Sequence, residues 1–167
     1  MGLLIRSMVG ECWLGTILVA ATDEGICAIL LGDDPASLLR DLEGRFPRAR
    51  LAGGDEALER LTVGVADLVE APGRDLDLPL DPRGTAFQRR VWQALREIPA
   101  GSTASYSEIA QRVGAPDEAY AVGEACAANM IAVAVPCHRV VRKDGGLAGY
   151  RWGLRRKRAL LRREGVR

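Results

Sequence analysis

The first 80 residues show two apolar runs of strand length, followed by two stretches in which apolar positions recur at helical spacing. The runs at 12–21 and 26–31 flank the turn Thr22-Asp-Glu-Gly and predict a β-hairpin. Asp34 and Pro35 provide an N-cap and a first helical residue, so a helix is predicted to follow them. Its apolar positions are Leu38, Leu39, Leu42 and Phe46.

A second helical pattern runs from about 56 to 70 and ends at Ala71-Pro-Gly. The segment Leu76-Asp-Leu-Pro-Leu predicts an edge strand, because an edge tolerates proline. This half of the chain contains no nucleophile–base pair, metal-ligand cluster or phosphate-binding loop. We therefore interpret it as a scaffold of strands and helices.

The second half is mainly helical. Residues 85–98 place Phe87, Val91, Trp92 and Leu95 on one face. Residues 130–135 form an apolar run that predicts an extended segment, and Lys143-Asp-Gly-Gly predicts a turn. A last helix is expected over 154–163. It carries the basic residues Arg155, Arg156, Lys157, Arg158, Arg162 and Arg163.

Two short helices are predicted between these segments. Ser105 caps the first, which contains Tyr106, and Gly114 ends it. Asp117 is expected to cap the second, which runs through Asn129. Two short helices joined by a glycine-bearing turn are typical of a helix-turn-helix, although many helical hairpins look similar.

Composition narrows the protein class. The chain has 167 residues, 48% of them hydrophobic, which suits one domain or two small lobes with a real core. No apolar run is long enough to span a bilayer, and residues 1–10 lack the layout of a signal peptide. The four cysteines form no CxxC pair and there is a single histidine, so neither zinc nor a disulfide framework is expected. A reducing cytoplasm is the expected compartment.

Charge is divided unevenly between the halves. Residues 1–80 hold 7 arginines against 14 acidic residues, a net −7, whereas residues 81–167 hold 16 basic against 8 acidic residues, a net +8. This asymmetry indicates either a half that faces a polyanion or two oppositely charged surfaces that attract each other.

The segment Val135-Pro-Cys-His-Arg-Val places Cys137 beside His138, the only histidine of the chain. A thiolate is the reactive form of cysteine, and a neighbouring base or cation lowers the thiol pKa. The alternative is a buried, inert cysteine. A thiol hydrolase is less well supported, because adjacent side chains in an extended segment point to opposite sides.

With these motifs in view, the chain resembles the O6-alkylguanine-DNA alkyltransferases, and in particular the carboxy-terminal domain of bacterial adaptive-response proteins. The resemblance covers nearly the whole chain. Its motifs are Glu11-Cys-Trp, Gly25-Ile-Cys-Ala-Ile-Leu-Leu-Gly-Asp-Asp, Arg83-Gly-Thr-Ala-Phe-Gln, Val91-Trp-Gln-Ala-Leu, Ser105-Tyr, Ala125-Cys-Ala-Ala-Asn, Pro136-Cys-His-Arg-Val-Val, Gly149-Tyr-Arg-Trp-Gly and Leu160-Leu-Arg-Arg-Glu.

The resemblance implies an α/β (α+β) fold with two lobes. Residues 1–81 would form a ribonuclease-H-like scaffold of a small sheet and helices. Residues 82–167 would form a winged helix-turn-helix alkyltransferase lobe. It also implies direct-reversal DNA repair by a monomer without a cofactor or metal, acting on double-stranded DNA that carries O6-alkylguanine, or O4-alkylthymine. The damaged base is flipped out, and its alkyl group passes irreversibly to a cysteine.

Residue roles follow from the same resemblance. Cys137 is the acceptor, His138 is the base acting through a bound water, and Glu164 orients that histidine. Tyr106 donates to the guanine ring, and Asn129 ties the second helix to the active-site segment. The backbone of Val140 and Arg151 and the ring of Tyr150 hold the base. Residues expected to contact DNA are Tyr120, Ala119, Arg89 and Arg139, with further basic residues at Arg90, Arg142 and the final helix.

The sequence departs from the family on the second helix, where Tyr120 stands in the place of an arginine that fills the gap left by the flipped base. A flat phenol could still wedge between bases. Residues 113–138 contain no Lys or Arg, and the carboxylates Asp117, Glu118 and Glu124 would repel phosphates.

Several interpretations therefore stay open beside DNA repair. The chain could be a variant with weakened DNA binding that acts on an alkylated small molecule. It could be an engineered form of such a variant, or a non-enzymatic module that binds damaged DNA.

Overall fold

The computed structural model describes residues 2–72 and 77–166. The chain divides into two compact units, Met1–Pro82 and Arg83–Arg167. Both contain helices and strands, so the fold is mixed α/β. Within the described residues, no helix has the length and apolar character needed to cross a membrane.

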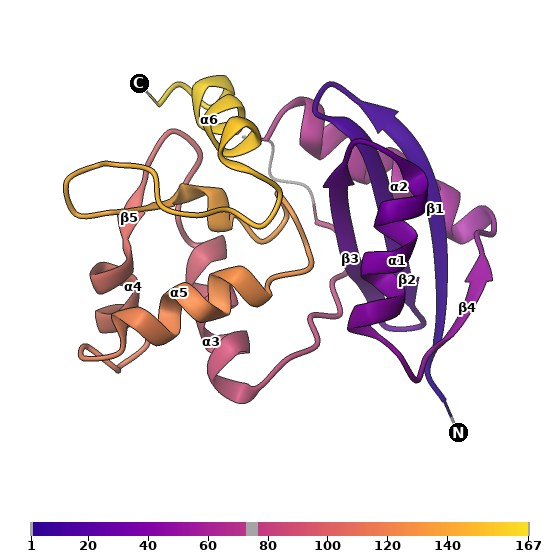
Figure 1. Cartoon of the computed structure of the whole chain (residues 1–167), viewed down its shortest axis with the longest axis horizontal. Coiled ribbons are helices and arrows are strands. Elements are labelled where there is room, and N and C mark those ends of the chain that lie inside the picture. The colour runs from indigo at the N-terminus through magenta and orange to yellow at the C-terminus, as the bar shows by residue number, and fades with distance from the viewer. Residues whose placement is uncertain (1, 73–76, 167) are drawn as a thin grey trace. The chain divides into compact units, whose positions relative to one another are not determined.

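The first unit is built on a four-stranded sheet with the order β3-β2-β1-β4 (Figure 1). β1 pairs antiparallel with β2, β2 pairs antiparallel with β3, and β4 joins the other edge of β1 in parallel. The strands are β1 (Leu4–Cys12), β2 (Gly15–Thr22), β3 (Gly25–Gly32) and β4 (Arg50–Gly53).

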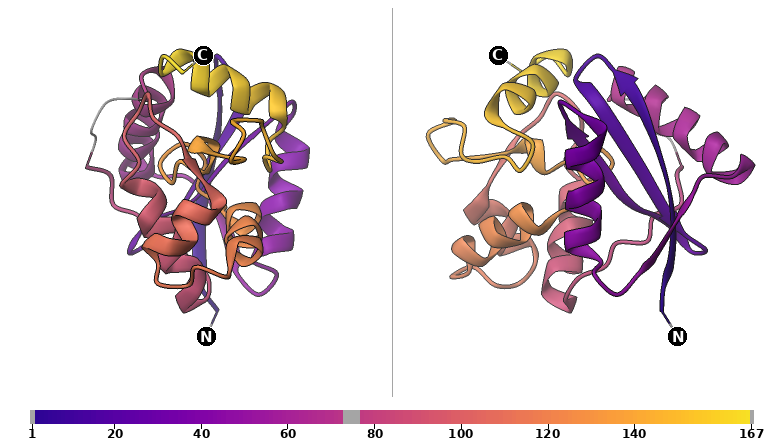
Figure 2. Two further views of the ribbon diagram at one scale, coloured as in Figure 1. Left: turned by 90° about the vertical axis from the view of Figure 1, so that its left-hand side faces the viewer. Right: turned by 45° about the vertical axis from the view of Figure 1, so that its right-hand side comes forward.

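Helices α1 (Pro35–Arg45) and α2 (Glu56–Glu70) lie on opposite faces of this sheet (Figure 2). Each begins at an aspartate whose carboxylate accepts a backbone N–H three residues on: Asp34 from Ser37 at 3.0 Å and Asp55 from Leu58 at 2.9 Å. Because both faces are covered, β2 and β3 are continuous apolar runs instead of alternating ones.

The predicted hairpin and both helices of this unit are confirmed, with Asp34 as the cap of the first. Strands β1 and β4 were not predicted, because polar residues such as Arg6 and Glu11 interrupt the apolar pattern of β1. The predicted edge strand begins at Leu76, which lies outside the described residues. Of its remainder, Leu80 forms an isolated parallel bridge with Ile26.

The second unit packs helices around the active-site segment. Its elements are α3 (Ala86–Arg96), β5 (Ala104–Ser105), α4 (Tyr106–Arg112), α5 (Ala119–Ala128), the 3-10 helix η1 (Cys137–Arg139), β6 (Val140–Val141) and α6 (Leu154–Arg163). Thr85 with Gln88, and Ser105 with Glu108, form reciprocal capping boxes that start α3 and α4. The Trp92 indole donates to the carbonyl of Ala125 at 2.8 Å and ties α3 to α5.

Helices α4 and α5 form the predicted helix-turn-helix, with Gly114 at a φ of 78° in the turn. The prediction that Asp117 caps the second helix is wrong. The N-cap is Glu118, which makes no side-chain capping bond, because Ala115 and Glu118 close a backbone turn at this point instead.

The apolar run at 130–135 is not extended, contrary to prediction. It folds into turns, with Val133 at a φ of 67°. The side chain of Asn129 accepts from the amide of Ile131 at 2.9 Å and donates to the carbonyl of Val135 at 3.0 Å. These bonds hold a β-branched residue in a conformation that it rarely adopts.

Candidate active site around Cys137

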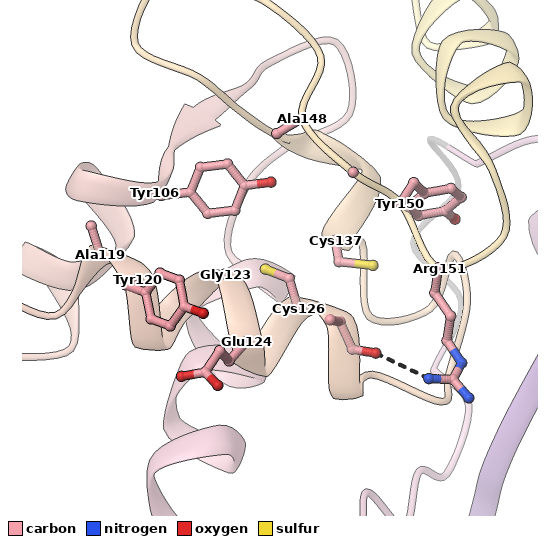
Figure 3. Close-up of a pocket in the computed structure, with 12 residues that line it drawn as sticks. Tyr106, Ala119, Tyr120, Gly123, Glu124, Cys126, Cys137, Ala148, Tyr150 and Arg151 are labelled. Carbon is pink, nitrogen blue, oxygen red and sulfur yellow. Dashed lines mark hydrogen bonds between the residues drawn. The ribbon is translucent and has the colours of Figure 1, made fainter.

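A cavity of about 790 Å³ lies within the second unit and opens beside the nucleophile candidate Cys137 (Figure 3). Its wall on α5 consists of Ala119, Tyr120, Gly123, Glu124, Cys126 and Ala127. Tyr106 lines it from α4, and residues 148–151 line it from the loop before α6. Because most of these side chains are small, the cavity has room for a planar base together with a substituent.

Cys137 is the first residue of η1 and is only 4% exposed, yet it lines the cavity. The amide of Asn129 donates to its sulfur at 3.3 Å. Burial nevertheless raises the thiol pKa to about 11, against the lowering effects of Asn129, Lys157 and Arg151. The expectation of a lowered thiol pKa is therefore wrong for the resting protein, in which Cys137 is a neutral thiol.

A buried group of hydrogen-bonded side chains, His138, Glu164 and Arg139, begins at the residue next to this thiol, and we call it the relay. His138 Nε2 is 2.9 Å from Glu164 Oε2, and neither side chain has any exposed surface. Arg139 forms a two-pronged ion pair with the same carboxylate, with Nε and Nη2 at 2.9 and 2.8 Å from its two oxygens. A third bond, from Arg139 Nη1 to the carbonyl of Ile98 at 2.7 Å, completes the arrangement.

In the resting relay, Glu164 is ionised and His138 is neutral. Burial alone would raise the pKa of Glu164, but the hydrogen bonds from His138 and Arg139 outweigh it and bring the pKa to about 2. Burial lowers the pKa of His138 more than Glu164 raises it. The resting histidine is therefore neutral and donates from Nε2 to Glu164. Its Nδ1 is buried without a hydrogen-bond partner among the described residues, so it is available as a base.

Two phenols complete the site. Burial, with the nearby thiols, raises the pKa of Tyr106 to about 12, so its hydroxyl remains a proton donor at neutral pH. Burial also raises the pKa of Tyr150 well above its ordinary value. The Tyr150 hydroxyl is buried without a partner among the described residues, and its ring packs edge-on against Trp152 at 5.3 Å. Both hydroxyls therefore stay protonated at neutral pH.

Of the two positions whose backbone is expected to hold the base, only Arg151 is among the lining residues described. Arg151 lines the cavity, and its guanidinium donates to the carbonyl of Ala127 at 3.1 Å, which ties the loop to the end of α5. Val140 is fully buried in β6 and is not among the lining residues described. Its amide donates back to the carbonyl of Cys137.

The residues expected to contact DNA fall into two groups. Tyr120 is 83% exposed at the cavity, with Ala119 beside it, and Arg89 is exposed on α3. Arg139 does not fit the expectation. It is only 7% exposed, and its guanidinium is held by Glu164 and Ile98, so we reassign it from DNA contact to the relay.

Two residues of the site were missed by sequence reasoning. Lys157 has the helical spacing of a surface cation, but it is fully buried and donates to the carbonyls of Ala148 and Gly149 at 3.2 and 3.4 Å. Cys126 lines the cavity together with Cys137. The signal that could have found Cys126 was its place in the motif Ala125-Cys-Ala-Ala-Asn, which ends at Asn129.

Across residues 2–72 and 77–166, no three side chains of His, Cys, Asp or Glu gather closely enough to hold a metal ion. The four cysteines Cys12, Cys27, Cys126 and Cys137 are all free thiols.

Comparison with known proteins gives a consistent result. A family profile described as "6-O-methylguanine DNA methyltransferase, DNA binding domain" matches residues 86–166. The chain is 51% identical over 162 residues to the bifunctional transcriptional activator/DNA repair enzyme Ada of Escherichia coli, covering 97% of this chain and 46% of that protein. The chain thus spans about half the length of this relative.

Other relatives are covered over most of their length. The inducible methylated-DNA–protein-cysteine methyltransferase of Bacillus subtilis is 39% identical, with 86% of this chain and 80% of that protein aligned. The crystal structure of the O6-methylguanine methyltransferase of Mycobacterium tuberculosis superposes with a TM-score of 0.76 at 35% identity, covering 96% of this chain and 92% of that chain. A structure of the same protein in complex with DNA has a TM-score of 0.75. The chain belongs to the methylated-DNA–protein-cysteine methyltransferase family.

Proposed function

We propose that this chain transfers an alkyl group from O6-alkylguanine in DNA to Cys137, once per molecule, and thereby repairs the base directly. The observation that carries the proposal is the buried relay of His138, Glu164 and Arg139 beside a thiol that faces a base-sized cavity. The family relationship supports the same chemistry.

The neutral thiol sets the order of events. Attack on the alkyl carbon forms the S–C bond and breaks the C–O6 bond, and the thiol must lose its proton as this happens. His138 Nδ1 takes that proton, through a bound water as the family resemblance implies. Glu164 remains ionised because of its low pKa, so it stabilises the imidazolium that forms.

The departing guanine also needs stabilisation. Negative charge develops on the base as the C–O6 bond breaks, and a donor that is still protonated at neutral pH counters it. Tyr106, with its pKa raised to about 12, meets this requirement. The product is a thioether that none of these groups can cleave, so each molecule reacts once.

Double-stranded DNA is the proposed partner, with the helix-turn-helix of α4 and α5 as the contacting element. Tyr120 would enter the space left by the flipped base as an uncharged wedge. We place the reaction in the reducing cytoplasm, in keeping with the free thiols.

The test is intact-mass measurement after incubation with O6-methylguanine duplex and, separately, with free O6-benzylguanine. One methyl or one benzyl group per protein is expected, mapped to Cys137 by peptide fragmentation. Cys137→Ala should remain unmodified, whereas the control Cys12→Ala, in the other unit, should react like the parent. An adduct that survives in Cys137→Ala would refute the assignment.

A further inference from the structure

The cavity contains a second thiol to which the proposed reaction gives no role. Cys126 comes from the last turns of α5 and lines the same cavity as Cys137, which comes from η1 (Figure 3). Asn129 connects the two cysteines, since its backbone amide donates to the carbonyl of Cys126 at 3.2 Å and its side chain donates to the sulfur of Cys137 at 3.3 Å. One residue therefore bonds to both thiol-bearing segments.

The surroundings of Cys126 depend on the state of Cys137. Burial raises the pKa of Cys126, the charge of a Cys137 thiolate raises it further, and Lys157 lowers it. At neutral pH the resting Cys137 is a neutral thiol and exerts no such charge. A positively charged sulfonium formed on Cys137 would act in the opposite direction and lower the pKa of Cys126.

We propose that Cys126 is a second alkyl acceptor, which captures alkyl groups that carry a leaving group on the carbon next to the transferred one, such as 2-haloethyl groups. This inference rests on the proposed function, because Cys137 must first receive the group. Nothing in the proposed methyl transfer requires Cys126.

The chemistry balances in two steps. Transfer of a 2-chloroethyl group leaves a β-chlorothioether on Cys137, whose sulfur displaces chloride and closes a three-membered sulfonium ring. The sulfur of Cys126 then attacks a ring carbon, a C–S⁺ bond breaks, and the Cys126 proton passes to solvent. The product is an ethylene bridge between the two sulfurs, with one chloride and one proton released.

Competing nucleophiles at the cavity wall are weaker. Burial raises the pKa of Cys126 as well as those of Tyr106 and Tyr150, so all three groups rest protonated and their reactivity as nucleophiles decides between them. Sulfur is intrinsically more nucleophilic toward carbon than these oxygens. A sulfonium ion also brings a positive charge beside Cys126, which favours its thiolate. Capture by Cys126 should therefore precede attack by a phenol or by water.

The experiment uses the full chain with free O6-(2-chloroethyl)guanine, and with free O6-ethylguanine as the substrate without a leaving group. The ethyl substrate should add one ethyl group to Cys137. The chloroethyl substrate should give a product lighter than the chloroethyl adduct by one HCl, with peptides containing Cys126 and Cys137 joined. In Cys126→Ala the joined peptide should be absent and a hydroxyethyl group on Cys137 should replace it, whereas Cys12→Ala should behave as the parent.

The possible outcomes separate the two proposals. A hydroxyethyl group on Cys137 of the parent protein, or joined peptides that persist in Cys126→Ala, would overturn the role of Cys126. If neither substrate modifies Cys137, and O6-methylguanine duplex also fails, the proposed function itself is lost. The parent protein decides the question by peptide mapping even if Cys126→Ala does not fold.

Discussion

The interior of the active site and the exposed face of α5 differ sharply in how completely their polar groups are paired. In the interior, one carboxylate, Glu164, is bonded to both His138 and Arg139. On α5, the exposed carboxylate Glu124 and the exposed phenol Tyr120 make no described bond that fixes them. The interior groups are thus committed to one geometry, whereas the outer face is free to vary without disturbing the fold.

This contrast separates chemistry from recognition. Substitutions of the bonded interior groups His138, Arg139 and Glu164 should affect both the stability of the second unit and the rate of transfer, because buried charges are strongly coupled. Substitutions on the outer face should affect the affinity for DNA alone. Four measurements test this division, from the largest expected effect to the smallest.

Removing the shared carboxylate should have the largest effect. Glu164→Ala removes the buried carboxylate that bonds both Arg139 and His138, so the free energy of unfolding should fall by about 3–5 kcal/mol in urea denaturation. Glu124→Ala removes an exposed carboxylate of the same unit and should change it by no more than about 0.5 kcal/mol. Equal losses for the two variants would contradict the contrast.

Acid should weaken the same interaction. The folded-state pKa of Glu164 is about 2, below the ordinary 4.5, so its contribution to stability is present above pH 4.5 and is lost as pH falls toward 2. The loss should reach up to about 3 kcal/mol. Urea denaturation across this range should show a shallower pH dependence for Glu164→Gln than for the parent, and matching slopes would argue against the assigned ion pair.

Tyr106→Phe should separate catalysis from stability. The ring stays in place but loses the donor for the departing guanine, so the rate of methyl transfer should fall about 100-fold. The urea midpoint should stay within experimental error, because no described bond of the hydroxyl is lost. Rapid-quench measurement of the labelled protein gives the rate, and an unchanged rate would remove Tyr106 from the reaction.

Tyr120→Arg should have the smallest effect, confined to DNA. An added cation at this 83% exposed position should strengthen duplex binding about tenfold at low salt. The slope of the logarithm of the binding constant against the logarithm of salt concentration should steepen by about one, for one more counterion released. Its rate on free O6-benzylguanine should match that of the parent. Salt-titrated fluorescence anisotropy checks the first expectation, and an identical salt slope would show that this face does not approach phosphates.

Local features of the second unit were predictable, because they depend on residues a few positions apart. The capping boxes at Thr85 and Ser105 need only the partner three residues on, and the helices followed their apolar spacing. The prediction failed at two places. Asn129 folds residues 130–135 into turns through side-chain bonds to positions two and six residues away, which the apolar pattern does not reveal. The packing of α6 buries Lys157 although its spacing is that of a surface cation.

The sequence by itself determined most local elements and the family, since these depend on apolar spacing and short motifs, and it predicted Cys137 as the nucleophile. Only the tertiary structure decided the protonation of that thiol, the commitment of Arg139 to Glu164, and the presence of Cys126 in the same cavity. The physical reason is that a pKa or a buried ion pair depends on solvent exclusion and on charges from distant segments. His138 and Glu164 are 26 residues apart, and no spacing rule places them 2.9 Å from each other.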